Sequence, residues 1–249
     1  MRFWINAKIL GTLLMTALVF FSCNADKCFN STGPIDEMEI EIGPIDKITV
    51  SDYIDLRVVQ SDEEKAILRA GANVIEHISV DYQSEGAGHI TISDLNKCRW
   101  LRNMEKRPEV EIHTPHLSKI NFFSHGDLVA EDWNLSHLEV ESLRSGRDFY
   151  IGGEIDTLRF LLEKGSPDLY LTGNSDFVFI YHFGSGFVYA EELIANRIHL
   201  HHNSTGDFHI FPIEELFAEI HGRGNVYYYN EPNEMGGPII GSGRILPGN

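Results

Sequence analysis

The feature that most constrains the fold is a repeat between Leu117 and Tyr229, in which a short apolar strand runs into a tight glycine turn and then into another apolar or aromatic strand. The fourth position of the turn recurs six times with a period of 18 to 21 residues. A fixed period of this size is typical of a solenoid, in which one unit forms one rung and cannot bury its apolar side alone. The turns begin at Ser124, Ser145, Gly165, Gly184, Ser204 and Gly222.

Apolar residues alternate with polar ones on both sides of each turn, which is the period of a β-strand with one buried face. Leu138 and Val140 precede a turn, Phe149 and Ile151 follow it, and the other rungs have apolar residues at similar positions. Each such side chain contributes about 1.5 to 3 kcal/mol when it is buried, and stacking makes the burial continuous. We therefore predict an all-β fold, a single-stranded parallel, right-handed β-helix with rungs of about 20 residues.

The fourth turn position carries a column of polar residues, and the glycine ahead of the turn aspartate suits a corner with positive φ. In one interpretation each carboxylate accepts backbone N–H groups of its own turn. In the other, the stacked carboxylates bind calcium. Phe187 interrupts the column and the calcium-binding nonapeptide repeat is absent, so we favour the first interpretation and predict no metal site. The column consists of Asp127, Asp148, Asp168, Asp207 and Asn225.

A second column follows two residues after the turn aspartates and points outward. Neighbouring rungs lie ~4.8 Å apart, so these rings would form an aromatic strip on the surface. Such a strip can bind sugar rings or another protein. Alternatively, it is a self-stacking ladder that stabilises the solenoid and binds nothing. The candidate ligand-binding residues are Tyr150, Tyr170, Tyr189, His209 and Tyr227.

Histidines are frequent, with 12 in the chain. The rung alignment predicts that His182 and His202 stack inward, either as a core pair or as half of a zinc site. His199, His201 and His221 are predicted to face outward beside aromatic residues of the preceding rung. This outward surface is a second candidate binding face, and no metalloenzyme spacing accompanies the histidines.

Upstream of the repeat, short alternating runs separated by acidic or glycine breaks predict further strands. Residues 24–44 are polar and turn-rich, with an alternating run from Met38 to Ile42, and we interpret them as a linker that passes into a first strand. The predicted organisation is a leader over 1–22, a tether over 23–44 and a β-helical domain over 45–246. Within that domain, 45–115 form an N-terminal β part and 116–230 the regular rungs. The predicted upstream strands are Ile48–Val50, Ile54–Val59, Ala66–Ala70, Ile78–Tyr82, His89–Ser93 and Glu109–His113.

Three upstream segments and the close of the repeat carry a resemblance to a known family. The segments Val50–Leu56, Gly71–Val80 and Val110–Ile120 resemble the head GIN domain of putative auto-transporter adhesins, and so does the run from Gly222 to Tyr228. One departure is Phe123-Ser124-His125-Gly126, where the family usually has Ser-Gly-Ser-Gly. The resemblance covers about residues 45–246. It implies a β-helical fold and a place in the cell envelope of Bacteroidetes, and it implies no reaction and no cofactor.

The N-terminus predicts an export signal. Arg2 and Lys8 precede an uncharged run that ends at Phe21 and is too short to span a bilayer as a mature helix. Ser22 before Cys23 resembles the lipobox of bacterial lipoproteins, which implies cleavage before Cys23 and a diacylglyceryl group on its thiol. The alternative is an ordinary secretory signal with an incidental cysteine. The resemblance implies a lipid-anchored protein of the outer membrane, on its periplasmic face or on the cell surface.

Two further cysteines remain in the exported chain. Cys28 and Cys98 can pair as a disulfide in an oxidising compartment. Two free buried thiols are the alternative.

The net charge and the absence of catalytic motifs limit the classes of function that the chain can have. The net charge of −17 argues against nucleic acid as a partner, because phosphate binding needs clustered Lys and Arg. The chain has no Gly-x-Ser-x-Gly elbow, phosphate loop or dinucleotide motif. We predict a non-enzymatic envelope lipoprotein that adheres, binds or scaffolds, with an envelope protein or a glycan as partner. The alternative is a glycan-binding or glycan-cleaving β-helical protein.

Overall fold

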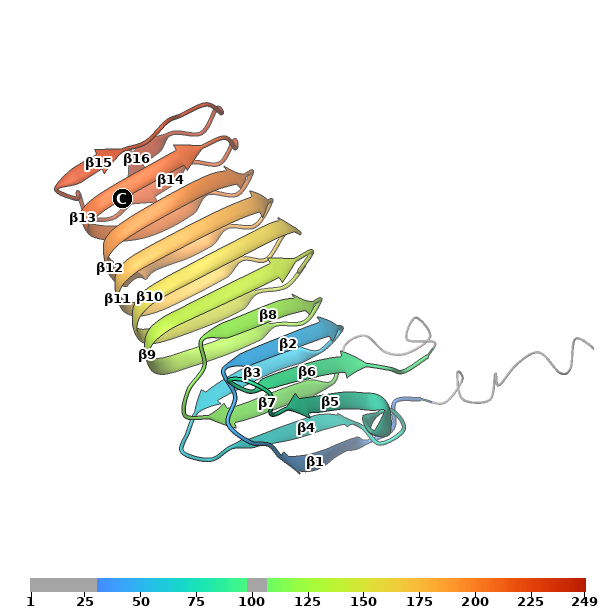
Figure 1. The fold of residues 1–249 in the computed structure, drawn as a ribbon. Coiled ribbons are helices and arrows are strands. Elements are labelled where there is room, and N and C mark those ends of the chain that lie inside the picture. Colours follow the sequence, from blue (N-terminus) through green and yellow to red (C-terminus); the bar gives the residue numbers. More distant parts are fainter. Residues whose placement is uncertain (1–30, 98–106) are drawn as a thin grey trace, which may run out of the picture.

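The computed structural model describes residues 31–97 and 107–249. Its strands form one sheet that coils into a parallel solenoid of about six turns, which confirms the predicted fold class (Figure 1). No helix in these two described ranges is long and apolar enough to cross a membrane. The strands are β1 (Ile35–Glu41), β2 (Lys47–Asp52), β3 (Asp55–Gln60), β4 (Lys65–Gly71), β5 (Ile78–Gln83), β6 (His89–Asp94), β7 (Glu109–Thr114), β8 (Lys119–Ser124), β9 (Leu128–Leu143), β10 (Phe149–Gly165), β11 (Leu169–Gly184), β12 (Val188–Ser204), β13 (Phe208–Ile220), β14 (Val226–Tyr228), β15 (Glu234–Gly236) and β16 (Ile245–Pro247).

Strands β9 to β13 form the regular part of the solenoid. Each of them has 13 to 17 residues and bends around one corner, so its first and last residues lie on different sides. We call the side formed just after the glycine turn the post-turn face and the other the pre-turn face. On the pre-turn face the register aligns Leu158 with Val178, and Val178 with Ile198, in one buried column. The predicted inward alternation is confirmed.

The turn glycines have a different role from the predicted one. The glycines with positive φ in the regular part are Gly153 and Gly173, at the bend within the strands, and not those of the turns. At the third turn position a methyl group on Gly206 would overlap the carbonyl oxygen of Gly186, and one on Gly224 would overlap that of Gly206. At these two turns glycine is therefore needed because stacked turns approach closely, whereas Arg147 and Pro167 occupy the third position of two other turns. The expectation of positive φ at the turn glycines was wrong.

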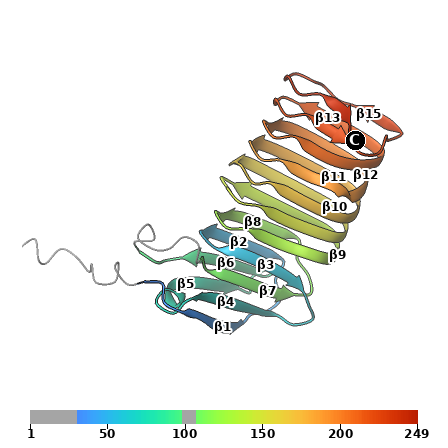
Figure 2. The ribbon, with the colours of Figure 1, turned by 180° about the vertical axis from the view of Figure 1, so that it is seen from behind.

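The N-terminal rungs do not stack in the order of the sequence. Strands β2 and β3 form one rung, which has β8 and β9 on one side and β6 and β7 on the other, all parallel to it. The later rung β6–β7 thus lies between the rung β2–β3 and the rung β4–β5 (Figure 2).

The first end of the solenoid is closed by reversed strands. Strands β4 and β5, joined across the short 3-10 helix η2 (Ile75–His77), run antiparallel to β7 and β6. Strand β1 pairs antiparallel with β4 as the outermost strand. A purely parallel β-helix was predicted, and these antiparallel pairs are the difference.

Strand β1 lies within the segment 24–44, in which a linker was expected to pass into a first strand. It pairs with β4 along its whole length. The predicted leader, the lipid-carrying Cys23 and the pair Cys28 and Cys98 lie outside the described residues.

Candidate functional site

The predicted aromatic column is present on the post-turn face. Tyr170 is in register with Tyr150 on one side and with Tyr189 on the other. Adjacent ring centroids lie 4.9 to 5.7 Å apart, and the planes differ by 9 to 18°. We call this column the tyrosine ladder, and its members are Tyr150, Tyr170, Tyr189, His209 and Tyr227.

Stacking limits what the tyrosine ladder can bind. Because the rings cover one another, the inner members expose their edges and hydroxyl groups and not their flat faces. The Tyr150 hydroxyl donates to Asp148 Oδ2 at 3.5 Å. Burial, together with nearby aspartates, raises the pKa of the Tyr150, Tyr170 and Tyr189 hydroxyls. The ladder therefore favours rung-to-rung stabilisation. Ligand binding by the ladder stays a prediction, confined to edge contacts.

The turn aspartates connect successive rungs. Asp168 Oδ1 accepts the backbone N–H of Phe187 at 2.8 Å, and Asp207 Oδ1 accepts that of Asn225 at 2.6 Å. The expectation that each carboxylate accepts N–H groups of its own turn was therefore wrong at these positions, because stacking brings the next rung's N–H to the carboxylate. Within the described residues, no group of three or more His, Cys, Asp or Glu side chains could hold a metal ion.

Two residues of this corner were missed by sequence reasoning. Asp55 Oδ1 accepts the backbone N–H of Asp127 at 2.8 Å. Arg107 Nε donates to Asp55 Oδ1 at 3.0 Å, and its Nη2 lies 3.5 Å from Asp127 Oδ2. The pair Asp55-Leu56 repeats Asp127-Leu128, which is a signal that an alignment of all turns could have found. Nothing in the local sequence of Arg107 indicates its partners.

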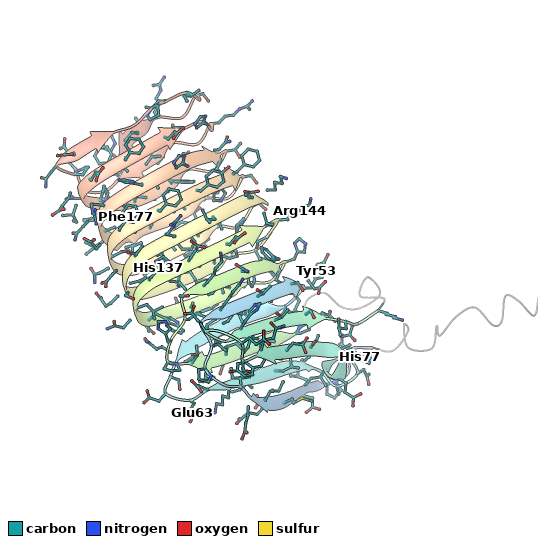
Figure 3. The ribbon with its side chains drawn as sticks, viewed as in Figure 1. Tyr53, Glu63, His77, His137, Arg144 and Phe177 are labelled. Carbon is teal, nitrogen blue, oxygen red and sulfur yellow. The ribbon has the colours of Figure 1, made fainter. Side chains whose placement is uncertain are left out.

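The pre-turn face carries the second candidate surface, as predicted. Alternate residues of β11 point outward and form an aromatic row, and β12 and β13 add histidines and a further ring beside it. Figure 3 labels Phe177 on this side, with His137 two strands away in the same register. We call this surface the aromatic–histidine patch, and it consists of Phe177, Phe179, Tyr181, Phe183, His199, His201, Phe217 and His221.

The rings of the aromatic–histidine patch are tilted against one another and not stacked in a column. Phe177 meets His199 edge-on, with an interplanar angle of 82°, and Phe179 and His201 are tilted by 57°. Phe183 is 42% exposed and Phe217 is 38% exposed. Phe183 and Phe217 can therefore contact a ligand through more than the ring edge, whereas the inner rings of the tyrosine ladder are covered by their stacked neighbours.

Charged groups in and around the patch are paired within the chain. His199 Nε2 lies 3.1 Å from Glu215 Oε1. The Glu219 carboxylate contacts two histidines: His201 Nδ1 lies 3.2 Å from it and His221 Nε2 lies 2.6 Å from it. The contact with His221 lowers the pKa of Glu219.

Two arginines complete this pairing and also cover two rings of the row. Arg197 lies 2.7 Å from Asp176, and its guanidinium lies 5.5 Å from the centroid of Phe177. Arg159 lies 3.7 Å from a carboxylate of the preceding rung, and its guanidinium lies 5.2 Å from the Phe179 centroid. These are cation–π distances, which hold the arginines beside the rings.

His182 and His202 are buried in one column, as predicted. His202 Nδ1 accepts the backbone N–H of Ser204 at 3.2 Å, and its ring stacks on Phe208 with centroids 4.0 Å apart. Neither ring nitrogen of His182 has a hydrogen-bond partner. Burial lowers the pKa of both histidines to about 4. They are core residues, and among the described residues no third His, Cys, Asp or Glu side chain joins them as a possible metal ligand.

A hollow of about 350 Å³ lies beside the end rungs. It is lined in part by Asp46, Glu64 and His116. The Asp46 carboxylate is already engaged, because Ser118 Oγ donates to it at 2.6 Å and His116 Nε2 lies 3.3 Å away.

Comparison with known proteins identifies the family. The family model described as "Putative auto-transporter adhesin, head GIN domain" matches residues 44–232, most of the chain. The chain belongs to this family. The resemblance of Val50–Leu56, Gly71–Val80 and Val110–Ile120 to the GIN domain is thereby confirmed.

Solved structures similar to this GIN-family chain share its fold. A putative adhesin from Bacteroides fragilis has a TM-score of 0.74 at 19% identity, over 88% of this chain and 99% of that one. A putative lipid binding protein from Parabacteroides distasonis has a TM-score of 0.64 at 20% identity, with the same coverage. A putative adhesin from Parabacteroides merdae has a TM-score of 0.57 at 14% identity, also over 88% and 99%. No curated protein matches the chain.

Proposed function

We propose that this GIN-family chain is a lipid-anchored outer-membrane protein that acts without catalysis, by adhesion or scaffolding, and that its contact surface is the aromatic–histidine patch. The observation that carries the proposal is the outward row on β11, in which four aromatic side chains follow one another at alternate positions. Aromatic and arginine side chains dominate binding energy at protein surfaces.

The family and the chemistry of the described residues both favour a binding role. The family is described as an adhesin, and so are two of the three similar structures above. The surface candidates are columns of rings and paired charges, which suit contact and supply no activated nucleophile or poised acid–base pair.

The lipid anchor rests on the sequence around Cys23. A lipobox cysteine would carry the acyl chains that hold the domain to the membrane, and more than one chain is needed for firm anchoring. Changing Cys23→Ser should release the protein from the membrane fraction. Protease shaving of intact cells then separates a cell-surface position, in which the protein is cut, from a periplasmic one, in which it is protected. A Cys23→Ser protein that stays in the membrane fraction would contradict the anchor.

Adhesion is tested with the full chain expressed in a lipoprotein-processing bacterium. Cells carrying the wild-type chain should adhere to coated surfaces or aggregate more than cells without it, and Phe179→Ala/Tyr181→Ala should remove the effect. The matched control is Tyr170→Ser/Tyr189→Ser in the tyrosine ladder, which should keep adhesion where the protein still folds. Equal adhesion by the patch variant and the wild type would overturn the patch as contact surface. Release of reducing sugar from polysaccharides by the pure protein would instead support the enzymatic alternative.

A further inference from the structure

We infer that the partner of the aromatic–histidine patch is a neutral polysaccharide chain, an inference that rests on the patch being the contact surface proposed above. Three properties of the patch point to this chemistry: its charge pairing, its size and the orientation of its rings.

Charge pairing points to a neutral ligand. The patch arginines and histidines already face carboxylates, through Arg197–Asp176, His199–Glu215 and the two contacts of Glu219. An anionic ligand would have to displace these carboxylates and would also meet a chain with a net charge of −17. A cationic ligand would compete with Arg159 and Arg197 for the ring faces of Phe179 and Phe177. A neutral ligand meets neither obstacle.

The size of the patch favours a chain-like ligand over a protein surface. Alternate residues along a strand lie ~6.7 Å apart and neighbouring strands ~4.8 Å apart, so the patch, which runs along β11 from Phe177 to Phe183 and across β12 to β13, spans roughly 20 Å by 10 Å. That is about 200 Å², whereas a stable protein interface buries about 800 Å² on each partner. A polysaccharide segment of a few sugar units needs only a narrow strip.

The arrangement of rings and polar groups matches the two-sided chemistry of a pyranose ring, which has an apolar C–H face and a rim of hydroxyls. Arg197 and Arg159 lie over the rings of Phe177 and Phe179, so the rings that can face the C–H side are those of Tyr181, tilted by 42° to His201, and Phe183, which is 42% exposed. His199 and His201 lie in the next strand, and with Glu215 and Glu219 they form the polar imidazole–carboxylate pairs beside the rings. Rings that fix a ligand's position with polar groups that orient it are the usual make-up of ligand sites.

The test is native gel electrophoresis of the full chain in mild detergent through gels that contain a dissolved polysaccharide. The neutral probes are dextran, mannan and laminarin, and the anionic probe is polygalacturonate. At least one neutral probe should retard the wild type, and Phe179→Ala/Tyr181→Ala should weaken that binding at least tenfold. Tyr170→Ser/Tyr189→Ser should leave it unchanged. Phe183→Ser, at an exposed position, provides a second patch variant in case the double variant does not fold.

Three results would overturn the inference: no retardation by any neutral probe, retardation by polygalacturonate alone, or unchanged binding in a folded patch variant. The proposed function is judged separately. If cells adhere through the patch to an enzymatically deglycosylated protein coat while the neutral probes fail, the contact surface stands and its partner is a protein.

Discussion

At the scale of single residues, the turn at Gly206 has no room for a side chain, because a methyl group there would overlap the carbonyl oxygen of Gly186 in the preceding rung. Gly206→Ala should cost about 2 to 4 kcal/mol, because the backbone of one turn must move away from the next. Gly146→Ala is the matched control, since a methyl group there meets no atom within 4 Å. Urea unfolding of the two variants should show a large loss for the first and a change near zero for the second. Equal losses would mean that turn contacts do not limit stability.

The buried histidines predict a pH dependence. The pKa of His182 and His202 is lowered to about 4 by burial, whereas an unfolded chain binds these protons near pH 6.5. The two histidines therefore do not reduce the free energy of unfolding above pH 6.5. This free energy falls as the pH drops from 6.5 towards 4, and below pH 4 these two groups cause no further loss. The loss by pH 4.5 should be roughly 2 to 3 kcal/mol for each histidine.

Denaturant unfolding at pH 7.5, 6.0 and 4.5 measures this loss. The double variant His182→Leu/His202→Leu should flatten the dependence over this range, since leucine does not titrate. A slope as steep in the variant as in the wild type would assign the pH effect to other groups.

At the scale of elements, Arg69 ties the reversed end of the solenoid together. It lies 2.8 Å from Glu37 in β1, 2.9 Å from Glu109 and 3.1 Å from Glu111 in β7. Arg69→Met should therefore loosen β1 while it leaves the regular rungs intact, at a cost of about 1 kcal/mol because the site is partly exposed. Hydrogen exchange should accelerate in residues 35–41 and stay unchanged in β10 to β13.

The control for this element is Arg197→Met. Arg69 contacts carboxylates on two other strands, whereas Arg197 forms a single surface ion pair, with Asp176. Its exchange pattern should match that of the wild type. Accelerated exchange throughout the solenoid in Arg69→Met would show that the end rungs and the regular rungs unfold as one unit.

The same elements show how far the sequence predicts the fold. Alternation predicts which residues lie inward, and Val178, Ile198 and His202 are buried as expected, because alternation depends only on local chain geometry. Strand order is different: β2 pairs with β6 and β8, and every rung has the same alternation, so no pattern distinguishes the true neighbour from a false one. The insertion of β6–β7 was therefore not predictable from periodicity.

The candidate sites were likewise predictable from the sequence only in part. The tyrosine ladder was predictable because its position within the rung is fixed by the turn. Its closed ring faces were not, since the 9 to 18° angles depend on side-chain rotation. The pairing of Glu219 with two histidines likewise depends on register between β12 and β13, which shifts between Ala195 and Arg197.

At the scale of the whole molecule, each regular rung contacts only its neighbours, so a rung can be removed. Leu169 and Val188 occupy the same register position in successive rungs, and deletion of 169–187 joins Asp168 directly to Val188. The shortened chain should fold into a solenoid with one rung fewer and a lower melting temperature, since stability in such folds is a sum over rungs and their interfaces. Circular dichroism and size exclusion measure the result.

Deletion of half a rung, 169–178, is the control. It joins Asp168 to Phe179, so an outward residue takes the inward position of Leu169. The apolar side chains that follow in the strand would then face solvent. This variant should aggregate or remain unfolded. Cooperative folding of both deletions would contradict the nearest-neighbour description.

The out-of-order rung β6–β7 also determines the order in which the protein can fold during synthesis. A chain that emerges from the ribosome N-terminus first exposes β2 and β3 before either neighbouring rung has been synthesised. The rung β6–β7 is complete only once Thr114 has emerged, and β8 only once Ser124 has emerged. From β9 onward each new strand finds its template already in place. The first part must therefore assemble as a seed through distant pairings, which are slow, and the remainder can grow on that seed at the pace at which the chain arrives.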